Sequence, residues 1–124
     1  MSAENEKIVT DFCQAWSRRN VEEILSYLTD DCFYHNIPMD PCVGKAAIRK
    51  FVEPFLKDAQ SAEFEIKHTT SADNVVMNER VDRFVMGPKK VELPVAGVFE
   101  IKNGRIAAWR DYFDLGGFTK QMGG

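Results

Sequence analysis

The spacing of apolar residues changes once along this 124-residue chain, near residue 60, and this change constrains the fold most. Before it, apolar side chains recur every three or four positions, the spacing of amphipathic helices. After it, they alternate with polar ones, the spacing of strands with one buried face. A helical part followed by consecutive strands predicts an α+β fold with the helices on one side of the sheet. The length suits one domain, which we expect to cover residues 1–124.

The first part predicts three helices and one short strand. Apolar residues 8–16 form the stripe of the first helix. A capping box that begins at Asn20 opens a short second helix, which is expected to end at Asp30. Residues 32–36 form a strand, and a third helix follows it. Pro54 is expected to kink or end this third helix.

The second part predicts a sheet of long strands joined by tight turns. Four strands are expected at residues 62–70, 75–86, 90–101 and 105–115. Asn103-Gly104 is a strong two-residue hairpin signal. A strongly curved, mostly antiparallel sheet closed by helices forms a cone with a hollow end. The glycine-rich residues 116–124 are expected to fray, with Phe118 able to fold back over the cavity.

Charge and cysteine content exclude several classes of function. The net charge of -3 gives no electrostatic help to nucleic-acid binding. No apolar run reaches the roughly 20 residues of a membrane span, and the start lacks the pattern of a signal peptide. The three cysteines indicate reduced thiols in a cytoplasmic protein. Cys32 and His35 supply only half of a metal site, so no metal is expected.

Two strands carry charged residues on faces that are otherwise apolar. Arg80 and Asp82 stand two residues apart on one face of a strand. Asp111 stands between Trp109 and Phe113 on one face of the last strand, where an ionised carboxylate needs compensation. If adjacent antiparallel strands bring Arg80 near Asp111, an Asp–Arg–Asp row results. The alternatives are a solvated ion pair and a buried salt bridge between strands.

Tyr34 and Asn36 share a face of the short strand, with Phe33 and His35 on the other. A phenol and an amide together can hold one water molecule. The aromatic content of 11% is high for a small chain and suggests a large core or an apolar cavity.

Taken in order, these residues resemble the limonene-1,2-epoxide hydrolase family, within the NTF2-like (SnoaL-like) superfamily. Four segments carry the resemblance: Tyr34-x-Asn36-x-Pro38, Glu79–Asp82, Gly97–Phe99 and Trp109–Asp114. The opening Glu6–Val9 and Phe12 fit as well. The resemblance implies an NTF2-like cone and an epoxide hydrolase that converts a small apolar epoxide into a vicinal diol. It also implies a homodimer that uses no cofactor.

The resemblance further implies a role for each polar residue. Asp111 is the expected general base, acting on a water held by Tyr34 and Asn36. Asp82 is the expected general acid for the epoxide oxygen. Arg80 orients both aspartates. Water would attack an epoxide carbon in one step without a covalent enzyme intermediate. The chemistry agrees, because water is a poor nucleophile and an alkoxide a poor leaving group.

The expected cavity wall combines face alternation with the resemblance. Alternation indicates Phe84, Leu93, Val95 and Phe113. The resemblance adds Cys13, Trp16, Phe55, Phe64 and Phe118. The remaining phenylalanines (Phe12, Phe33, Phe51 and Phe99) are assigned to the core or an interface, and Met39 is interpreted as a gap-filling residue. Cys13 and Trp16 at the closed end reshape the cavity, so limonene oxide itself need not be the substrate.

Two further functions compete with epoxide hydrolysis. A ketosteroid-isomerase-like enzyme needs a base and oxyanion donors, but no arginine between two aspartates. A non-catalytic NTF2-like domain that binds an apolar ligand needs none of the five polar residues. Turnover of an epoxide panel in ¹⁸O-labelled water separates the three.

Overall fold

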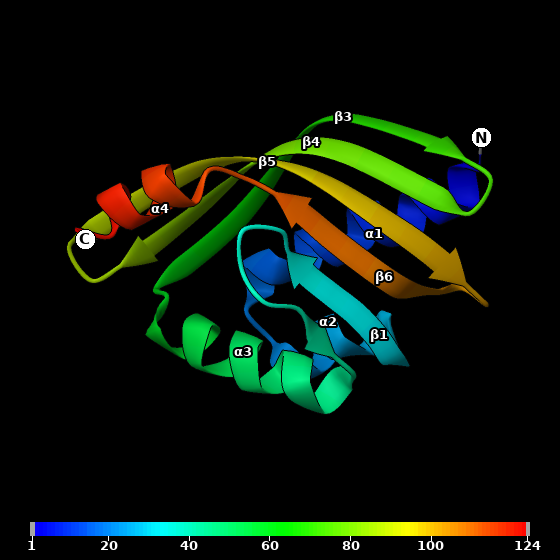
Figure 1. The fold of residues 1–124 in the computed structure, drawn as a ribbon, viewed down its shortest axis with the longest axis horizontal. Helices are drawn as coiled ribbons and strands as arrows, with labels where there is room; N and C mark the ends of the chain where they lie inside the picture. The colour runs from blue at the N-terminus through cyan, green and yellow to red at the C-terminus, as the bar shows by residue number, and fades with distance from the viewer. Residues whose placement is uncertain (1, 124) are drawn as a thin grey trace.

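The change of spacing near residue 60 corresponds to a change from helices to sheet in the computed structural model, which describes residues 2–123 (Figure 1). The helical elements are α1 (Ala3–Ala15), the 3-10 turn η1 (Trp16–Arg18), α2 (Val21–Ser26), α3 (Lys45–Asp58) and α4 (Leu115–Gln121). The strands are β1 (Leu28–Asn36), β2 (Cys42–Val43), β3 (Ser61–Ala72), β4 (Val75–Met86), β5 (Lys89–Lys102) and β6 (Arg105–Tyr112). The predicted α+β class is confirmed.

All six strands form one curved sheet, in the order β2-β1-β6-β5-β4-β3 (Figure 1). The long strands β3, β4, β5 and β6 form an antiparallel meander. β1 adds to the edge of β6 in parallel, so the sheet is mixed. The parallel pairing places β1, from the first third of the chain, directly beside β6, the last strand.

The inner face of the sheet carries the core, and α1 packs on it. Alternate residues of β4 and β5 are buried, as a strand with one covered face requires. The fully buried Phe12 of α1 lies edge-on to Trp109, with ring centroids 4.9 Å apart. The Phe99 ring stacks on Trp109 and meets Phe12 edge-on, with ring centroids 6.2 Å apart in both pairs. These rings fix α1 against the middle of the sheet.

Element boundaries differ from the sequence-based expectation at three places. α2 ends at Ser26, and Leu28 already opens β1, where it is buried. α3 continues to Asp58, so of the two expected effects of Pro54, a kink or an end, the end was wrong. A proline late in a helix removes a single backbone bond, and the packing of Val52 and Leu56 holds the remaining turn in place.

The third difference is the C-terminal segment. β6 ends at Tyr112, not at residue 115, and the glycine-rich run predicted to fray forms α4. Tertiary contacts compensate for the poor helix propensity of glycine. The Gln121 amide makes two hydrogen bonds with the Glu92 backbone, at 2.7 and 2.8 Å. Gly124, the last residue of that run, lies outside the described residues. Within residues 2–123, no helix is long and apolar enough to cross a membrane.

Candidate active site

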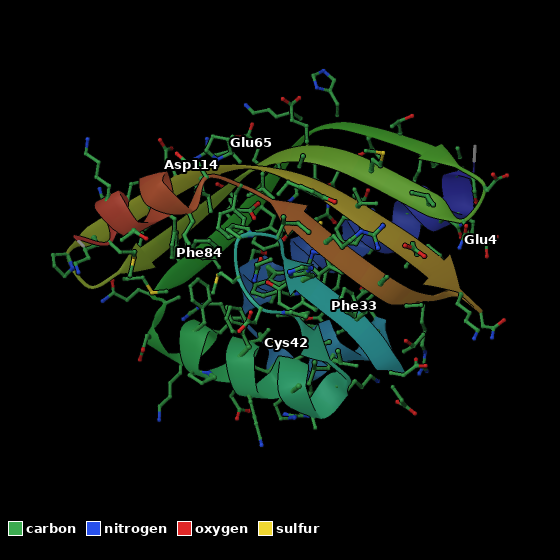
Figure 2. The ribbon with its side chains drawn as sticks, viewed as in Figure 1. Glu4, Phe33, Cys42, Glu65, Phe84 and Asp114 are labelled. Carbon is green, nitrogen blue, oxygen red and sulfur yellow. The ribbon has the colours of Figure 1, made fainter. Side chains whose placement is uncertain are left out.

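A cavity of about 250 Å³ opens between the inner face of the sheet and the helices α3 and α4. Its lining is mostly aromatic and aliphatic, with a few polar side chains. Figure 2 shows Phe84 pointing from β4 into the space above α3, where its ring meets Phe55 edge-on at 4.7 Å. The lining residues are Trp16, Tyr34, Asn36, Met39, Phe51, Val52, Phe55, Phe64, Asp82, Phe84, Leu93, Val95, Asp111, Phe113 and Phe118.

Every expected wall residue except Cys13 lies in this lining. Cys13 is fully buried in α1 behind the wall, where its Sγ accepts a hydrogen bond from Asn78 Nδ2 at 3.6 Å. Trp16, one turn later, does reach the cavity and stacks on Phe64 with ring centroids 4.8 Å apart. Cys13 therefore contacts Asn78 of β4, and neither residue lines the cavity.

Three lining residues were missed by sequence reasoning: Met39, Phe51 and Val52. Phe51 had been assigned to the core or an interface and Met39 to gap filling. In the structure Phe51 is 36% exposed and Met39 38% exposed, which places them at the mouth rather than in the core. Phe51 lies on the same helical face as Phe55, and this shared face was the available signal.

At the floor of the cavity, Arg80 joins two buried aspartates. Arg80 Nε donates to Asp82 Oδ1 at 3.0 Å, and Nη2 donates to Asp82 Oδ2 at 2.9 Å. The same Nη2 donates to Asp111 Oδ2 at 3.1 Å. All three residues are at most 4% exposed. The predicted Asp–Arg–Asp row is therefore present, and it is buried rather than solvated.

The expectation that adjacent strands carry this row was wrong, because β5 lies between β4 and β6. Gly97 of β5 pairs with Asn78 on one side and with Asp111 on the other. A Cβ at Gly97 would overlap Arg80 Nη1 and would lie 2.9 Å from Asn78 Oδ1. The absence of a side chain at this one position lets the Arg80 guanidinium cross β5 and reach Asp111.

Tyr34 and Asn36 reach the same floor through the parallel pairing of β1 and β6. The register places Asn36 opposite Asp111 and Tyr34 opposite Trp109. The Tyr34 ring stacks on Trp109 at 3.8 Å, and Asn36 Nδ2 donates to Tyr34 Oη at 2.8 Å. Asp111 Oδ1 is buried and has no hydrogen-bond partner within residues 2–123. A strong acceptor thus stands free beside a phenol and an amide.

Burial sets the protonation of the groups at the floor. Burial, together with the Asp111 charge, raises the pKa of Asp82 to about 6 even though Arg80 opposes the shift. Burial raises the pKa of Tyr34 well above its ordinary range, so the phenol keeps its proton. Burial opposes the charge on Arg80, but the two carboxylates outweigh it and hold the Arg80 pKa above its ordinary value.

The remaining candidate groups have structural positions. Burial raises the pKa of Cys13 to about 12, so this thiol is not a nucleophile. His35 Nε2 lies 2.8 Å from the Met39 carbonyl, on the face of β1 away from Tyr34, as alternation predicts. Among residues 2–123, no cluster of histidine, cysteine and acidic side chains is arranged to hold a metal ion.

Comparison with known proteins agrees with this geometry. Residues 3–123 match the family model described as the limonene-1,2-epoxide hydrolase catalytic domain. The chain belongs to the limonene-1,2-epoxide hydrolase family. It is 37% identical over 112 residues to epoxide hydrolase EphG of Mycobacterium tuberculosis, an alignment that covers 86% of this chain and 71% of EphG. The resemblance stated from sequence is confirmed.

Solved structures extend the comparison from the family to the fold. A limonene-epoxide-hydrolase-like epoxide hydrolase from M. tuberculosis superposes with a TM-score of 0.86 at 28% identity, covering 97% of this chain and 90% of that one. An NTF2-like protein from Burkholderia pseudomallei superposes with a TM-score of 0.87 at 17% identity, covering 100% of both chains. The second likeness shows the NTF2-like fold alone. The family match and the EphG alignment together show that this chain is an epoxide hydrolase.

Proposed function

We propose that this enzyme adds water to a small apolar epoxide and forms a vicinal diol in one general acid–base step. One observation carries the proposal most directly. Asp111 presents a buried, unpartnered carboxylate oxygen at the floor of an apolar cavity, and Asp82 faces the same cavity across the shared Arg80. A base and an acid at one apolar site are what opening an epoxide by water requires.

Each group has one part in the proposed step. Tyr34 and Asn36 hold the water, and Asp111 Oδ1 accepts its proton. The water oxygen forms a bond with one epoxide carbon as the bond from that carbon to the epoxide oxygen breaks. Asp82 gives its proton to that oxygen, which becomes the second hydroxyl. The product is a diol, and proton exchange with solvent restores both aspartates.

The two aspartates differ in ways that favour this assignment. Asp82 receives two hydrogen bonds from Arg80 and has a pKa raised to about 6, so it keeps its proton to a higher pH than an ordinary aspartate does. Asp111 receives one bond from Arg80 and keeps its other oxygen free. A carboxyl that retains its proton suits the acid, and a carboxylate with a free oxygen suits the base.

The assignment predicts the behaviour of two variants. Asp111→Asn and Asp82→Asn should each lower kcat by about 10²–10⁴-fold, because each removes one proton transfer while keeping the size of the side chain. Diol formation is measured in ¹⁸O-labelled water, with the label expected in the diol after a single turnover. Glu79→Gln, on the exposed outer side of β4, is the matched control and should stay active. An Asp111→Asn enzyme with near-normal kcat would falsify the base assignment.

The cavity supports a compact apolar substrate. Eleven of its fifteen lining residues are Phe, Trp, Leu, Val or Met, and the other four form the polar floor. The cavity volume is about 250 Å³. The stacked Trp16 and Phe64 rings narrow the end beside α1. Small cyclic and terminal epoxides are therefore the substrates to test first. Tight binding of an apolar compound without turnover across that panel would support a non-catalytic binding domain instead.

We also propose that the enzyme is a homodimer that works in the cytoplasm. The outer face of the sheet exposes apolar side chains, including Met77 at 46% and Tyr112 at 45%. Antiparallel sheets with apolar residues on both faces need a cover, and a second copy supplies one. The three free thiols favour a reducing compartment.

A further inference from the structure

Asn78 lies directly behind the catalytic floor, and the proposed step gives it no role. Its side chain is 5% exposed and does not line the cavity. Asn78 Oδ1 accepts a hydrogen bond from Arg80 Nη1 at 3.0 Å, and Asn78 Nδ2 donates to Cys13 Sγ. Within residues 2–123, this amide oxygen is the one hydrogen-bond acceptor of Nη1. The other two nitrogens of Arg80 are directed to carboxylates.

The sheet register places Asn78 and Asp111 on opposite sides of the same gap. Both residues pair with Gly97, one from β4 and the other from β6. Arg80 Nη1 occupies the space where a Gly97 side chain would stand. The guanidinium therefore lies between a neutral amide and a carboxylate, and its orientation decides how many bonds the carboxylate receives.

An unrestrained guanidinium favours two parallel bonds to one carboxylate. Arg80 already makes such a pair with Asp82, while Asp111 receives one bond and keeps Oδ1 free. A second bond from Arg80 would occupy the oxygen that must accept the proton of water. The hydrogen bond to Asn78 Oδ1 holds Nη1 over Gly97.

We propose that Asn78 is a positioning residue that holds Arg80 so that Asp111 Oδ1 stays free to act as the base. This inference rests on the proposed function. Removal of the amide leaves Nη1 buried without an acceptor, a state that is strongly unfavourable for a charged donor. Nη1 then turns toward Asp111, and the base loses its free oxygen. Because Asn78 does not touch the cavity, substrate binding changes little.

A pair of variants at position 78 tests this role. Asn78→Val removes the acceptor of Nη1. Asn78→Thr introduces a side chain of nearly the same shape as valine, but its hydroxyl oxygen can accept from Nη1. We expect kcat to fall by about 10²-fold in Asn78→Val, with KM close to that of the wild type, since small misplacements at a catalytic site have effects of this size. Asn78→Thr should recover most of the loss.

Val76→Ala is the matched control for a purely structural effect. Val76 is fully buried on the same face of β4, two residues from Asn78. Its truncation should lower the melting temperature and leave kcat unchanged. If Asn78→Val fails to fold, Asn78→Ala and Asn78→Ser give the same comparison with smaller side chains.

The outcomes separate this inference from the proposed function. If the wild type and Asn78→Val are equally active, the role of Asn78 is overturned and the proposed function stands. Equal losses of kcat in the valine and threonine variants, or a loss carried by KM, would overturn it too. A wild type that forms no diol from any epoxide would overturn both. A kcat loss specific to valine, recovered by threonine and absent in Val76→Ala, supports the role.

Discussion

Gly97 shows how one residue without a side chain allows two strands that are not neighbours to share a charged site. Arg80 and Asp111 are separated by β5, yet they hydrogen-bond at 3.1 Å because the guanidinium crosses β5 at Gly97. The backbone of Gly97 is extended, so its conformational freedom is not the reason for glycine here. The reason is space, as in other strands where a group approaches the backbone closely.

Substitution of Gly97 should therefore damage catalysis more than folding. In Gly97→Ala, the new Cβ overlaps Arg80 Nη1 and forces the guanidinium out of the gap. We expect kcat to fall by about 10²-fold or more, as for other displaced catalytic groups. Gly87→Ala, in the β4–β5 turn, is the control for destabilisation alone, because alanine is strained at its φ of +62°. Wild-type kcat in Gly97→Ala would show that Arg80 does not need this gap.

Asp82 makes the stability of the folded protein depend on pH. Its folded-state pKa of about 6 lies above its ordinary value of 3.8, so the folded state binds this proton more tightly than the unfolded state. The stabilisation is complete below about pH 4 and is lost as the pH rises through about 6. Relative to the wild type, Asp82→Asn should gain about 1–3 kcal/mol of unfolding free energy across this window. Urea unfolding at several pH values measures the difference, and a constant difference would contradict it.

At the scale of elements, α4 is a short helix that is stabilised by contacts with β5 rather than by the helix propensity of its residues. It contains Gly116 and Gly117, which disfavour helix formation. Gln121 bonds the Glu92 backbone on β5, beyond the point where β6 ends. Phe118 of α4 lines the cavity, and its ring centroid lies 6.4 Å from that of Phe113, which also lines it. The Gln121 bonds that hold α4 therefore also keep Phe118 at the cavity.

Loss of the Gln121 contact should loosen α4 and weaken substrate binding. Two hydrogen bonds of this kind contribute about 1–3 kcal/mol together. In Gln121→Ala we expect amide exchange in α4 to speed up by roughly 10-fold and KM to rise, with kcat less affected. Lys120→Ala, on the exposed side of α4, is the control. Unchanged exchange in Gln121→Ala would mean that Phe118 packing alone holds the helix.

At the scale of the whole molecule, the two faces of the sheet differ in burial and in the side chains they carry. The inner face carries the core and the cavity, while alternate outer residues of β4 and β5 are exposed or half-buried. Charged pairs cross that outer face, among them Arg83 with Glu65 and Glu92. Apolar residues between them are the surface on which we propose that a second copy packs.

A charge in the middle of this outer face should separate the dimer. Ala96 is exposed and pairs with Glu79 and Tyr112 across the sheet. In Ala96→Glu, a dimer through this face would bring like charges together, which is destabilising. Sedimentation should give twice the chain mass of 14.1 kDa for the wild type and the single mass for the variant. A monomeric wild type would remove the proposal.

Local patterns were sufficient to predict the class of the fold and which polar side chains share a strand face. The change of spacing near residue 60 predicted helices followed by a sheet, because each period reflects which side chains one element can bury. Two-residue alternation placed Arg80 beside Asp82 and Tyr34 beside Asn36. The family resemblance joined those pairs to Asp111.

Tertiary structure alone decided what depends on contacts between distant segments. The C-terminal residues became α4 because Gln121 finds the Glu92 backbone, a partner that no local pattern reveals. Cys13 does not line the cavity, because α1 buries it fully against Asn78 of β4. The free oxygen of Asp111 depends on a register that aligns Asn78, Gly97 and Asp111 across three strands. Periodicity determines which face a side chain takes, but register determines which side chains meet.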